Sequence, residues 1–510
     1  MKTLRLILGD QLNSEHSWFK EKNEKVTYCL FELRQETDYV HHHIQKIVGF
    51  FLAMRTFRNT LISRGHEVIY FELDHPNNSQ SLTDNIHNLI ETHRFELFEY
   101  LLPDEFRLNK QLEDFAKQLN IKTSTVDSEH FLTHRFELRD FFKGKKSLLM
   151  ESFYRYMRKK HQILMNHGNP EGGKWNYDKS NQKKWKNQTL IPPQKLFSKN
   201  VTHLVNLIQE ADIRTIGEIP VNEFSFPVTR QEALIQLEYF CDKLLIHFGD
   251  FQDAMHTEEH MLYHSGLSFA LNLKLISPHE VINKVEEYYS ANSDKIHISQ
   301  VEGFIRQIIG WREYMRGVYW KEMPAYEKLN KLNNTHSLPD FYWSGKTRMT
   351  CLKTSISSSL KNAYAHHIQR LMITGNFALL TQTNTDEVDQ WYLGIYLDAI
   401  QWVQLPNTRG MSQWADGGTV ATKPYVSSAS YIHKMSNYCT HCAYDHKKRT
   451  GDNACPFNSL YWNFLDEKKE YFKNNPRMNM MLNLLSKIPA EELTQIKQRA
   501  SMIIENPDAF

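Results

Sequence analysis

The feature that most constrains this chain is the way its hydrophobic pattern changes along its length. Over residues 1–130, apolar runs of strand length alternate with stretches of helical spacing. The strand-like runs are residues 4–8, 26–33, 68–73 and 97–102, and the helical stretches are residues 38–64, 82–92 and 104–119. This alternation predicts a doubly wound parallel sheet, in which ligands bind beyond the carboxyl ends of the strands. Asp10 follows the first run and lies at such an end.

After residue 200 the pattern is helical. The helical stretches are residues 201–211, 230–248, 278–290, 300–320, 357–376, 387–401 and 490–505. They predict an all-α second half. Between the two halves, over residues 131–200, the spacing of apolar residues is irregular. A chain of 510 residues also exceeds the size at which a single core keeps growing. We therefore expect an α/β domain at residues 1–130, a linker at residues 131–200 and a helical domain at residues 201–510.

The net charge of the chain indicates no partner, but the charge of one segment does. The net charge of +2 gives no general argument for nucleic-acid binding. Residues 155–199, however, hold eleven Lys and Arg against two acids, with Trp175, Tyr177 and Trp185 among them. Such a strip fits a solvated linker and a DNA-facing segment about equally well. We find neither a run of 18 apolar residues nor a signal peptide, and we expect a cytoplasmic protein without a membrane partner.

Four of the six cysteines have metal-ligand spacing. They are Cys351, far upstream, the C-x2-C pair Cys439 and Cys442, and Cys455, which precedes a proline. In a long cytosolic chain clustered cysteines more often bind metal than form disulfides. Four thiolates suit either zinc or a 4Fe–4S cluster, and spacing alone does not separate the two. His441 and His446 keep a mixed Cys/His zinc site open.

Polar motifs interrupt the helical half. His264-Ser265-x-Leu267-Ser268 places two hydroxyls at an expected helix start, where they could bind phosphate or simply cap the helix. The adjacent pair His366-His367 lies in an expected helix, and adjacent side chains point about 100° apart there, so only one of them can serve a given pocket. A histidine suits acid catalysis because its pKa lies near neutrality.

Taken in order, these segments resemble one family over almost the whole chain. The segments are LGDQL, GGKWNYD, GDFQDAM, HSGLS, IGWREYMRGVYW, HHIQRLMITGNF, LPN with GMSQWADGG, and the set of four cysteines. They are similar to the photolyase/cryptochrome family, and specifically to its bacterial iron–sulfur branch, which includes prokaryotic (6-4) photolyases.

The resemblance implies three cofactors. FAD would lie in the helical domain, where the matching positions are His264, Ser265, Leu267, Ser268, Arg312, Asp398 and Gln404, the last of them facing flavin N5. The family pattern assigns a 4Fe–4S cluster, in preference to zinc, to Cys351, Cys439, Cys442 and Cys455. The α/β domain would bind an antenna, 6,7-dimethyl-8-ribityllumazine, at Asp10, Glu36 and Tyr39.

The resemblance also implies an activity, the light-driven repair of (6-4) photoproducts in UV-damaged single- or double-stranded DNA. Reduced FAD would pass an electron to a lesion flipped out of the DNA, and His367, beside His366, would donate a proton. Trp391, Tyr392 and Trp343 match a photoreduction chain. Positions expected to contact the DNA or the lesion are Tyr425, Lys183, Lys184, Lys186, Asp178 and Asp253.

Two departures from the family pattern matter. Leu371 stands where animal (6-4) enzymes carry a second histidine, so a mechanism with two histidines cannot be transferred. Gln404 stands where relatives can carry a carboxylate near Asp178 and Asp253, and a neutral amide weakens a cation site there. We expect a monomer. The competing hypotheses are a cryptochrome-like blue-light receptor without repair activity and an iron–sulfur nucleic-acid-binding module resembling the helical part of a primase.

Overall fold

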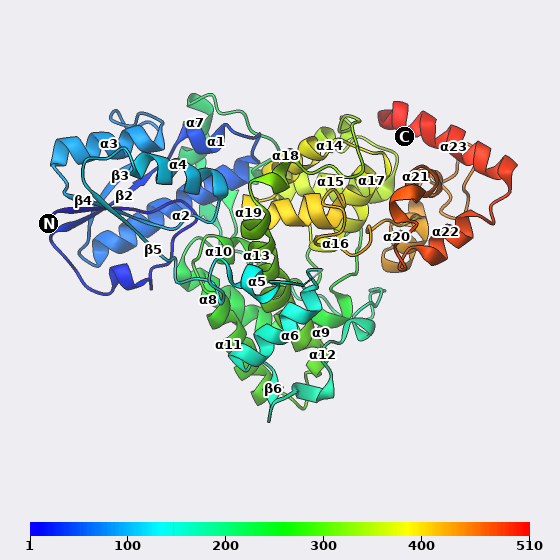
Figure 1. Cartoon of the computed structure of the whole chain (residues 1–510), viewed down its shortest axis with the longest axis horizontal. Coiled ribbons are helices and arrows are strands. Elements are labelled where there is room, and N and C mark those ends of the chain that lie inside the picture. Colours follow the sequence, from blue (N-terminus) through cyan, green and yellow to red (C-terminus); the bar gives the residue numbers. More distant parts are fainter. Residues whose placement is uncertain (146) are drawn as a thin grey trace.

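The computed structural model describes residues 1–145 and 147–510 (Figure 1). Its N-terminal part holds a five-stranded parallel sheet in the order β3-β2-β1-β4-β5. The strands are β1 (Thr3–Leu6), β2 (Val26–Phe31), β3 (Glu67–Phe71), β4 (Leu97–Leu101) and β5 (Lys122–Val126). Because the chain winds outward from β1 in both directions, the predicted doubly wound sheet is confirmed.

Both faces of the sheet are buried. Leu4, Leu6 and Phe31 point to the face that packs against α3 (Leu82–His93) and α4 (Phe106–Ala116). The alternate residues Tyr28 and Leu30 point to the other face, into the core that includes α2 (Ile44–Ser63). Side chains of opposite faces alternate along a strand, and a parallel sheet covered on both sides needs apolar residues on both. The short α1 (Arg34–Thr37) follows β2.

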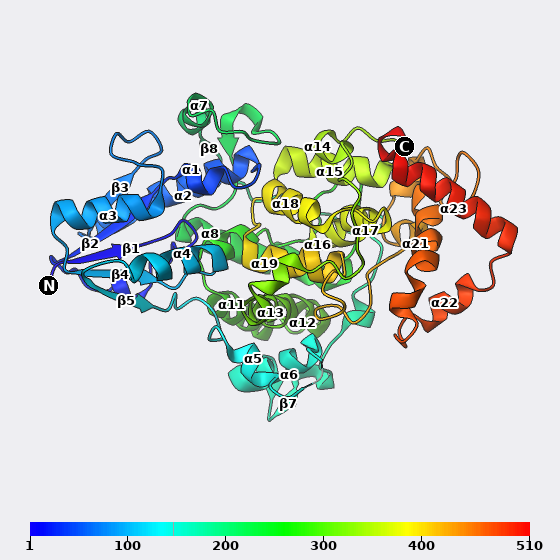
Figure 2. The same cartoon turned by 45° about the horizontal axis from the view of Figure 1, so that its top comes forward.

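The remainder of the chain is almost entirely helical (Figure 2). The helices up to residue 322 are α5 (Glu137–Phe141), α6 (Met150–His161), α7 (Thr202–Glu210), α8 (Arg230–Tyr239), α9 (Leu245–Phe251), α10 (Ser268–Asn272), α11 (Pro278–Ala291), α12 (Ile298–Ile305) and α13 (Glu313–Glu322). Two-residue strands form the pairs β6–β7 (Met165–Asn166 and Asn169–Pro170) and β8–β9 (Lys199–Asn200 and Glu223–Phe224). No helix in the described part of the chain is long and apolar enough to cross a membrane.

Ten further helices follow among the described residues. They are α14 (Phe341–Ser344), α15 (Thr350–Asn362), α16 (His367–Gln369), α17 (Asn376–Leu380), α18 (Thr385–Ile395), α19 (Gln401–Leu405), α20 (Ala429–Met435), α21 (Pro456–Phe472), α22 (Asn479–Leu485) and α23 (Ala490–Glu505). Of these, α20 to α23 form the end of the molecule that lies far from the sheet (Figure 1). Wider π-helical turns interrupt the helices at η5 (Phe240–Leu244), η6 (Arg306–Arg312), η8 (Arg370–Gly375) and η9 (Pro406–Ser412). Such turns often mark functional sites.

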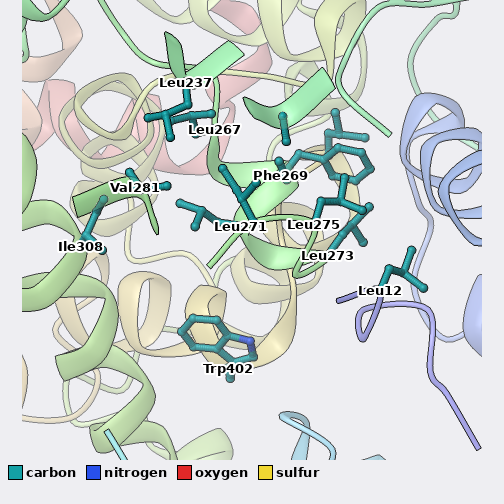
Figure 3. Packing of buried hydrophobic residues seen from close by; sticks show 14 of the residues in the cluster. Leu12, Leu237, Leu267, Phe269, Leu271, Leu273, Leu275, Val281, Ile308 and Trp402 are labelled. Carbon is teal, nitrogen blue, oxygen red and sulfur yellow. The ribbon is translucent and has the colours of Figure 1, made fainter. Parts of the chain in front are cut away.

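One hydrophobic core runs from the sheet into the helices. Figure 3 shows Leu12 of the N-terminal part near Leu273 and Leu275, which follow α10. The Leu12 amide donates a hydrogen bond of 2.9 Å to the Leu273 carbonyl across this junction. Phe153 and Met157, inside the expected linker, are fully buried in the same core. This core is continuous across residues 130 and 200, so it marks no domain boundary at either point. The division into domains at these residues stays a prediction.

The structure corrects several expected elements. The helix expected at residues 357–376 is wrong as a single unit, since α15 ends at Ala363 in a left-handed conformation (φ 51°) and α16 begins at His367. The helix expected at residues 387–401 ends at Ile395 and resumes at Gln401. The strand β5 and the helices α6 and α21 were not predicted. The sequence of β5, KTSTV, is polar because it lies at the edge of the sheet, where strands are commonly protected by polar residues.

Candidate active site

A cavity of about 500 Å3 opens among the helices of the central region. Thirteen of the residues singled out from the sequence line it: Asp178, Asp253, His264, Ser265, Leu267, Ser268, Arg312, His366, His367, Tyr392, Asp398, Gln404 and Tyr425. The π-helical turns η6, η8 and η9 all contribute to its wall. Segments that lie far apart in the sequence therefore converge on one chamber, and its volume is in the range of cofactor sites.

The HSGLS segment reaches the cavity through a tight turn. Gly266 adopts a left-handed conformation (φ 66°), which glycine reaches without strain. The Ser265 carbonyl accepts a hydrogen bond of 2.7 Å from Gln236 Nε2, and this bond fixes the turn. Ser268 is the first residue of α10, so the expected helix start is confirmed. The phosphate contacts expected for the two hydroxyls stay a prediction.

The two adjacent histidines have different settings. His366 precedes α16 and is 2% exposed, whereas His367 is the first residue of α16 and its imidazole is open to the cavity. The expectation that both lie within one helix is therefore wrong. The His366 ring stacks on the His264 ring, with centroids 4.7 Å apart. The surrounding walls and the charge of Arg370 lower the pKa of His367.

A bidentate ion pair forms part of the cavity wall. Arg370 Nη1 and Nη2 donate to the Asp398 carboxylate at 2.9 and 3.3 Å. The Arg370 guanidinium lies 3.8 Å from the ring centroid of Tyr396, which holds it in place. Arg370 was not among the predicted site residues, because its partner lies 28 residues further along the chain. The sequence did carry a signal for Arg370, because this residue ends the pattern HH-x-x-R.

Arg312 is buried between the cavity and the rings of Phe131 and Trp402, which meet edge to face. Its guanidinium lies 4.7 Å from the Trp402 ring, and Nη2 donates to the Leu271 carbonyl at 3.0 Å. Nη2 also lies 3.1 Å from Nε2 of the buried His130. Burial lowers the pKa of Arg312 to about 10, so the group stays charged at neutral pH. Figure 3 shows Trp402 and Leu271 among the buried side chains of the same core.

The cavity wall carries polar atoms that the protein does not satisfy. His264 Nε2 and Arg312 Nη1 are buried, and neither has a hydrogen-bond partner among the described residues. Leaving a buried polar group unpaired costs about 1–3 kcal/mol. The wall is therefore suited to an elongated ligand with several hydrogen-bonding groups, and the cationic Arg312 favours one that carries negative charge.

Acidic and basic residues meet at one side of the cavity. The Arg306 guanidinium pairs with Asp178 and lies 3.4 Å from Glu302. Burial and the charge of Asp178 raise the pKa of Asp253 to about 6. Arg306 was not predicted as a site residue. It compensates the charge of Asp178.

The structure connects two of the three residues expected for photoreduction. The ring centroids of Tyr392 and Trp391 are 5.1 Å apart, and Tyr392 lines the cavity. Trp391 also lies 5.1 Å from the ring of Tyr342, which the sequence did not indicate. Trp343 is 42% exposed, and its aromatic neighbour is His41 at 6.5 Å. The route from Trp391 to the surface therefore stays a prediction.

The four clustered cysteines face one small cavity. Cys351, Cys439, Cys442 and Cys455 all line it, and none forms a disulfide. Burial raises the pKa of the Cys455 thiol to about 12, and the neighbouring thiolates add to the rise. Among the described residues, no group of three or more Cys, His, Asp or Glu side chains is arranged to hold a single metal ion. His446 lines the same cavity, whereas His441 does not.

A second cavity of about 130 Å3 lies at the carboxyl ends of the strands. Asp10, Glu36 and Tyr39 line it, as expected for residues at this edge of a doubly wound sheet. Buried Lys274 from the helical part forms ion pairs with Asp10 (3.2 Å) and with Asp104 (2.9 Å). These pairs fix the position of Asp10 across the junction between the sheet and the helices.

The lysines expected to contact DNA lie outside the large cavity. Lys183 pairs with Asp250 at 2.9 Å, and Lys184 Nζ donates to the His433 carbonyl at 3.0 Å. Lys186 is exposed. In the same basic strip, Arg158 is fully buried and donates to backbone carbonyls, so it serves the fold. Arg158 is therefore not available to a phosphate backbone, whereas Lys183 and Lys186 are exposed.

Comparisons with known proteins identify the family. A family model described as deoxyribodipyrimidine photo-lyase-related protein matches residues 5–225. The chain is 40% identical over 511 aligned residues to a (6-4) photolyase of Agrobacterium fabrum, with 100% of each chain covered. It belongs to the photolyase/cryptochrome family. The resemblance drawn from the sequence motifs is thus confirmed.

Solved structures of photolyases and cryptochromes share the fold. A bacterial class III photolyase from Agrobacterium tumefaciens matches with a TM-score of 0.58, 13% identity and coverage of 99% of this chain and 97% of the other. A cryptochrome from Synechocystis matches with a TM-score of 0.57, 13% identity and coverage of 97% and 93%. At this level of identity the likeness shows the photolyase/cryptochrome architecture and nothing finer.

Proposed function

We propose that this protein repairs (6-4) photoproducts in UV-damaged DNA with blue light. The observation that carries the proposal is the full-length identity of 40% with a (6-4) photolyase. The same chain places His366, His367 and the Arg370–Asp398 pair on the wall of one cavity. A photolyase needs such a chamber for a flavin and, beside it, for a base flipped out of the DNA.

The large cavity is the FAD site in this proposal. When bound and reduced, FAD would supply one electron to the lesion on absorbing blue light. His264, Ser265, Leu267, Ser268 and Arg312 would hold it, since two of them offer unpaired polar atoms. The Arg312 guanidinium favours the negative charge of a pyrophosphate. The Arg370–Asp398 pair places a positive and a negative group at fixed positions on the cavity wall.

His367 is the proton donor in this proposal. Its pKa is lowered in the free protein, so its imidazole is largely neutral at pH 7. A negative charge brought into the cavity by the damaged DNA raises the pKa of His367 and charges it when an acid is needed. His366, held in its stack with His264, fixes the turn from which His367 projects.

The lesion would enter past Tyr425, Asp178 and Asp253, which line the cavity. Tyr425 would fill the gap left by the flipped base. Lys183 and Lys186 are exposed and Lys184 is half-buried, and all three would contact the DNA phosphates. We propose that the enzyme acts as a cytoplasmic monomer on single- or double-stranded DNA.

A 4Fe–4S cluster would be held by Cys351, Cys439, Cys442 and Cys455. Four thiols face one cavity, and four thiolates are the ligand set of a 4Fe–4S cluster. Cys351 lies in the first turn of α15 and Cys455 directly precedes α21, so the cluster would tie these two helices together.

The smaller cavity would bind the lumazine antenna at Asp10, Glu36 and Tyr39. The helix α19 separates the two cavities, because Gln401 and Trp402 line the smaller one while Val403 and Gln404 line the larger one. A single helix is about 10–12 Å across, a short distance for transfer of excitation energy. Tyr392, Trp391 and Trp343 would refill the flavin with electrons from the surface.

The decisive experiment uses an oligonucleotide with one (6-4) photoproduct. The purified, reduced protein is incubated with it in blue light and in darkness, and the restored bases are quantified. Light-dependent restoration supports the proposal. No restoration, while FAD and the iron–sulfur absorbance are present, would overturn it and favour a photoreceptor, once cyclobutane dimers have been tried in the same assay. A colourless, flavin-free preparation would favour a nucleic-acid-binding module.

A further inference from the structure

A buried glutamine holds the turn that carries His367. Gln369 is the last residue of α16, and its side chain is buried. Its Oε1 accepts a hydrogen bond of 3.2 Å from the His366 amide. Its Nε2 donates a hydrogen bond of 3.0 Å to the hydroxyl oxygen of Tyr438. The two ends of one side-chain amide therefore join the active-site turn to a tyrosine 69 residues further along the chain.

This tyrosine belongs to the cysteine site. Tyr438 is the first residue of the short helix η10 (Tyr438–His441) and is buried. It lines the same small cavity as the four clustered cysteines, and Cys439 follows it directly in the chain. A group bound by the Cys439 thiolate would therefore also hold the backbone of Tyr438. The side chains of Tyr438 and Gln369 thus link the cysteine cavity to the turn before α16.

The position of His367 depends on this turn, because no described residue forms a hydrogen bond with its imidazole. Two hydrogen bonds anchor the backbone just before it. Arg370 Nε donates to the Ala365 carbonyl at 2.7 Å, and Gln369 accepts from the His366 amide. A reacting group displaced by about 1 Å can lose about 100-fold in rate, so the loss of one anchor is felt in the chemistry.

A second tyrosine shows that burial beside the cysteines does not by itself pair a hydroxyl. Tyr444 lines the same cavity and is buried. Its hydroxyl has no hydrogen-bond partner among the described residues. The hydroxyl of Tyr438, in contrast, meets the one side chain that also binds the active-site turn. This difference supplies a matched pair of tyrosines for a test.

We propose that Gln369 and Tyr438 are positioning residues for the proton donor His367, and that through them the cysteine site fixes the active-site turn. The inference rests on the proposed function, in which His367 gives the proton. Among the described residues that line the large cavity, neither Gln369 nor Tyr438 is found, so their effect reaches the chemistry through the backbone of His366. The loss of either side chain should lower the yield of repair and leave the binding of FAD, iron and damaged DNA unchanged.

The first test measures repair per absorbed photon in FAD-loaded, reduced protein. We expect Gln369→Leu and Tyr438→Phe to lower this yield at least about tenfold, since the proton donor loses its fixed position. Iron content, FAD absorbance and the affinity for the damaged oligonucleotide should stay at the wild-type level. Gln369→Glu should restore much of the yield, because one carboxylate oxygen accepts from the His366 amide and the other from the Tyr438 hydroxyl. Tyr444→Phe is the matched control and should repair like the wild type.

The second test examines the turn without DNA or light. Histidines are modified with diethyl pyrocarbonate in the dark, and trypsin then releases residues 362–370, which carry both His366 and His367. In the wild type the buried His366 should be protected while the exposed His367 reacts. We expect His366 to become reactive in Gln369→Leu and Tyr438→Phe, and to stay protected in Gln369→Glu and Tyr444→Phe.

The outcomes separate this inference from the proposed function. A wild-type yield together with a protected His366 in Gln369→Leu and Tyr438→Phe would overturn the positioning role. If Gln369→Leu does not fold, Tyr438→Phe, which loses a single oxygen atom, decides alone. Loss of iron from Tyr438→Phe would assign Tyr438 to the cysteine site only and would also overturn it. If the wild type repairs no lesion while His366 becomes reactive in both variants, the proposed function fails and the link to the cysteine site stands.

Discussion

The imidazole rings of His264 and His366 lie stacked in the wall of the large cavity, with centroids 4.7 Å apart and planes inclined by 16°. The contact joins the HSGLS turn to the turn that precedes α16. Burial lowers the pKa of His264 to about 4 and that of His366 well below its usual value. Both rings are therefore neutral at pH 7, because burial disfavours their charged forms.

This stack predicts a loss of stability in mild acid. Unfolded histidines take up protons near pH 6.5, but the folded His264 does so only near pH 4, so the unfolded state binds more protons between these values. The free energy of unfolding should therefore fall by about 1–2 kcal/mol between pH 7 and pH 5 for His264 alone. Urea unfolding at both pH values measures it. His264→Gln should flatten the dependence, and an unchanged slope in that variant would contradict the prediction.

His367 should be required for repair and not for flavin binding. His367→Gln keeps a polar side chain in the cavity but removes the acid, and general acid catalysis contributes about 10²–10⁴-fold. We expect repair to fall by at least about 100-fold while the FAD absorbance persists. His433→Gln, an exposed position outside the cavity, is the matched control. If His367→Gln repairs at the wild-type rate, the donor is another residue.

Repair should depend little on magnesium. Arg306 already compensates Asp178, the pKa of Asp253 is raised to about 6, and Gln404 is neutral, so this side of the cavity offers little net negative charge to a cation. A chelator should change the rate less than about twofold, a change worth only ~0.4 kcal/mol of barrier. Gln404→Glu should introduce a magnesium dependence. Wild-type repair that is abolished by a chelator and restored by magnesium would refute the prediction.

The sequence predicted the fold where local pattern and tertiary structure agree. The apolar runs of β1 to β4 are buried or partly buried and were recognised, whereas KTSTV of the edge strand β5 is polar. The break after α15 has no Gly or Pro to announce it. Ala363 adopts its left-handed conformation where its carbonyl accepts a hydrogen bond of 2.9 Å from the Leu397 amide, a contact that only the folded chain creates.

The residues of the candidate site also separate into those that the sequence reveals and those that only the folded chain reveals. Residues within short motifs, such as His264 and His367, could be found from the sequence, and the structure brings them to one cavity. Arg370 and Arg306 act through partners elsewhere in the chain, Asp398 and Asp178, and such pairings have no local signature.

The four clustered cysteines should be needed for a folded C-terminal region. Cys439→Ala removes one ligand of the proposed cluster, and we expect insoluble protein or soluble protein without iron. Cys241→Ala, a buried thiol outside this group, is the control and should retain iron and solubility. Iron analysis and thermal unfolding measure both outcomes. Fully folded Cys439→Ala protein with wild-type stability would contradict a structural role for the cluster.

The side chain of Asp508 fixes the start of the helix that carries Trp343. Its Oδ1 accepts from the Phe341 amide at 2.8 Å, and its Oδ2 accepts from the Asp340 amide at 3.2 Å. Trp343 follows on α14 and is 42% exposed. Asp508→Ala leaves both amides unpaired, which costs about 0.5–2 kcal/mol for a helix cap.

We expect Asp508→Ala to lower the unfolding temperature slightly and to slow flavin photoreduction by an external thiol severalfold, because Trp343 loses its fixed position. The iron content should stay at the wild-type level. Glu505→Ala, exposed at the end of α23, is the matched control and should change neither property. If Asp508→Ala lowers stability but leaves photoreduction unchanged, Trp343 lies off the electron route. In that case Tyr342, which contacts Trp391 directly, becomes the next residue to substitute.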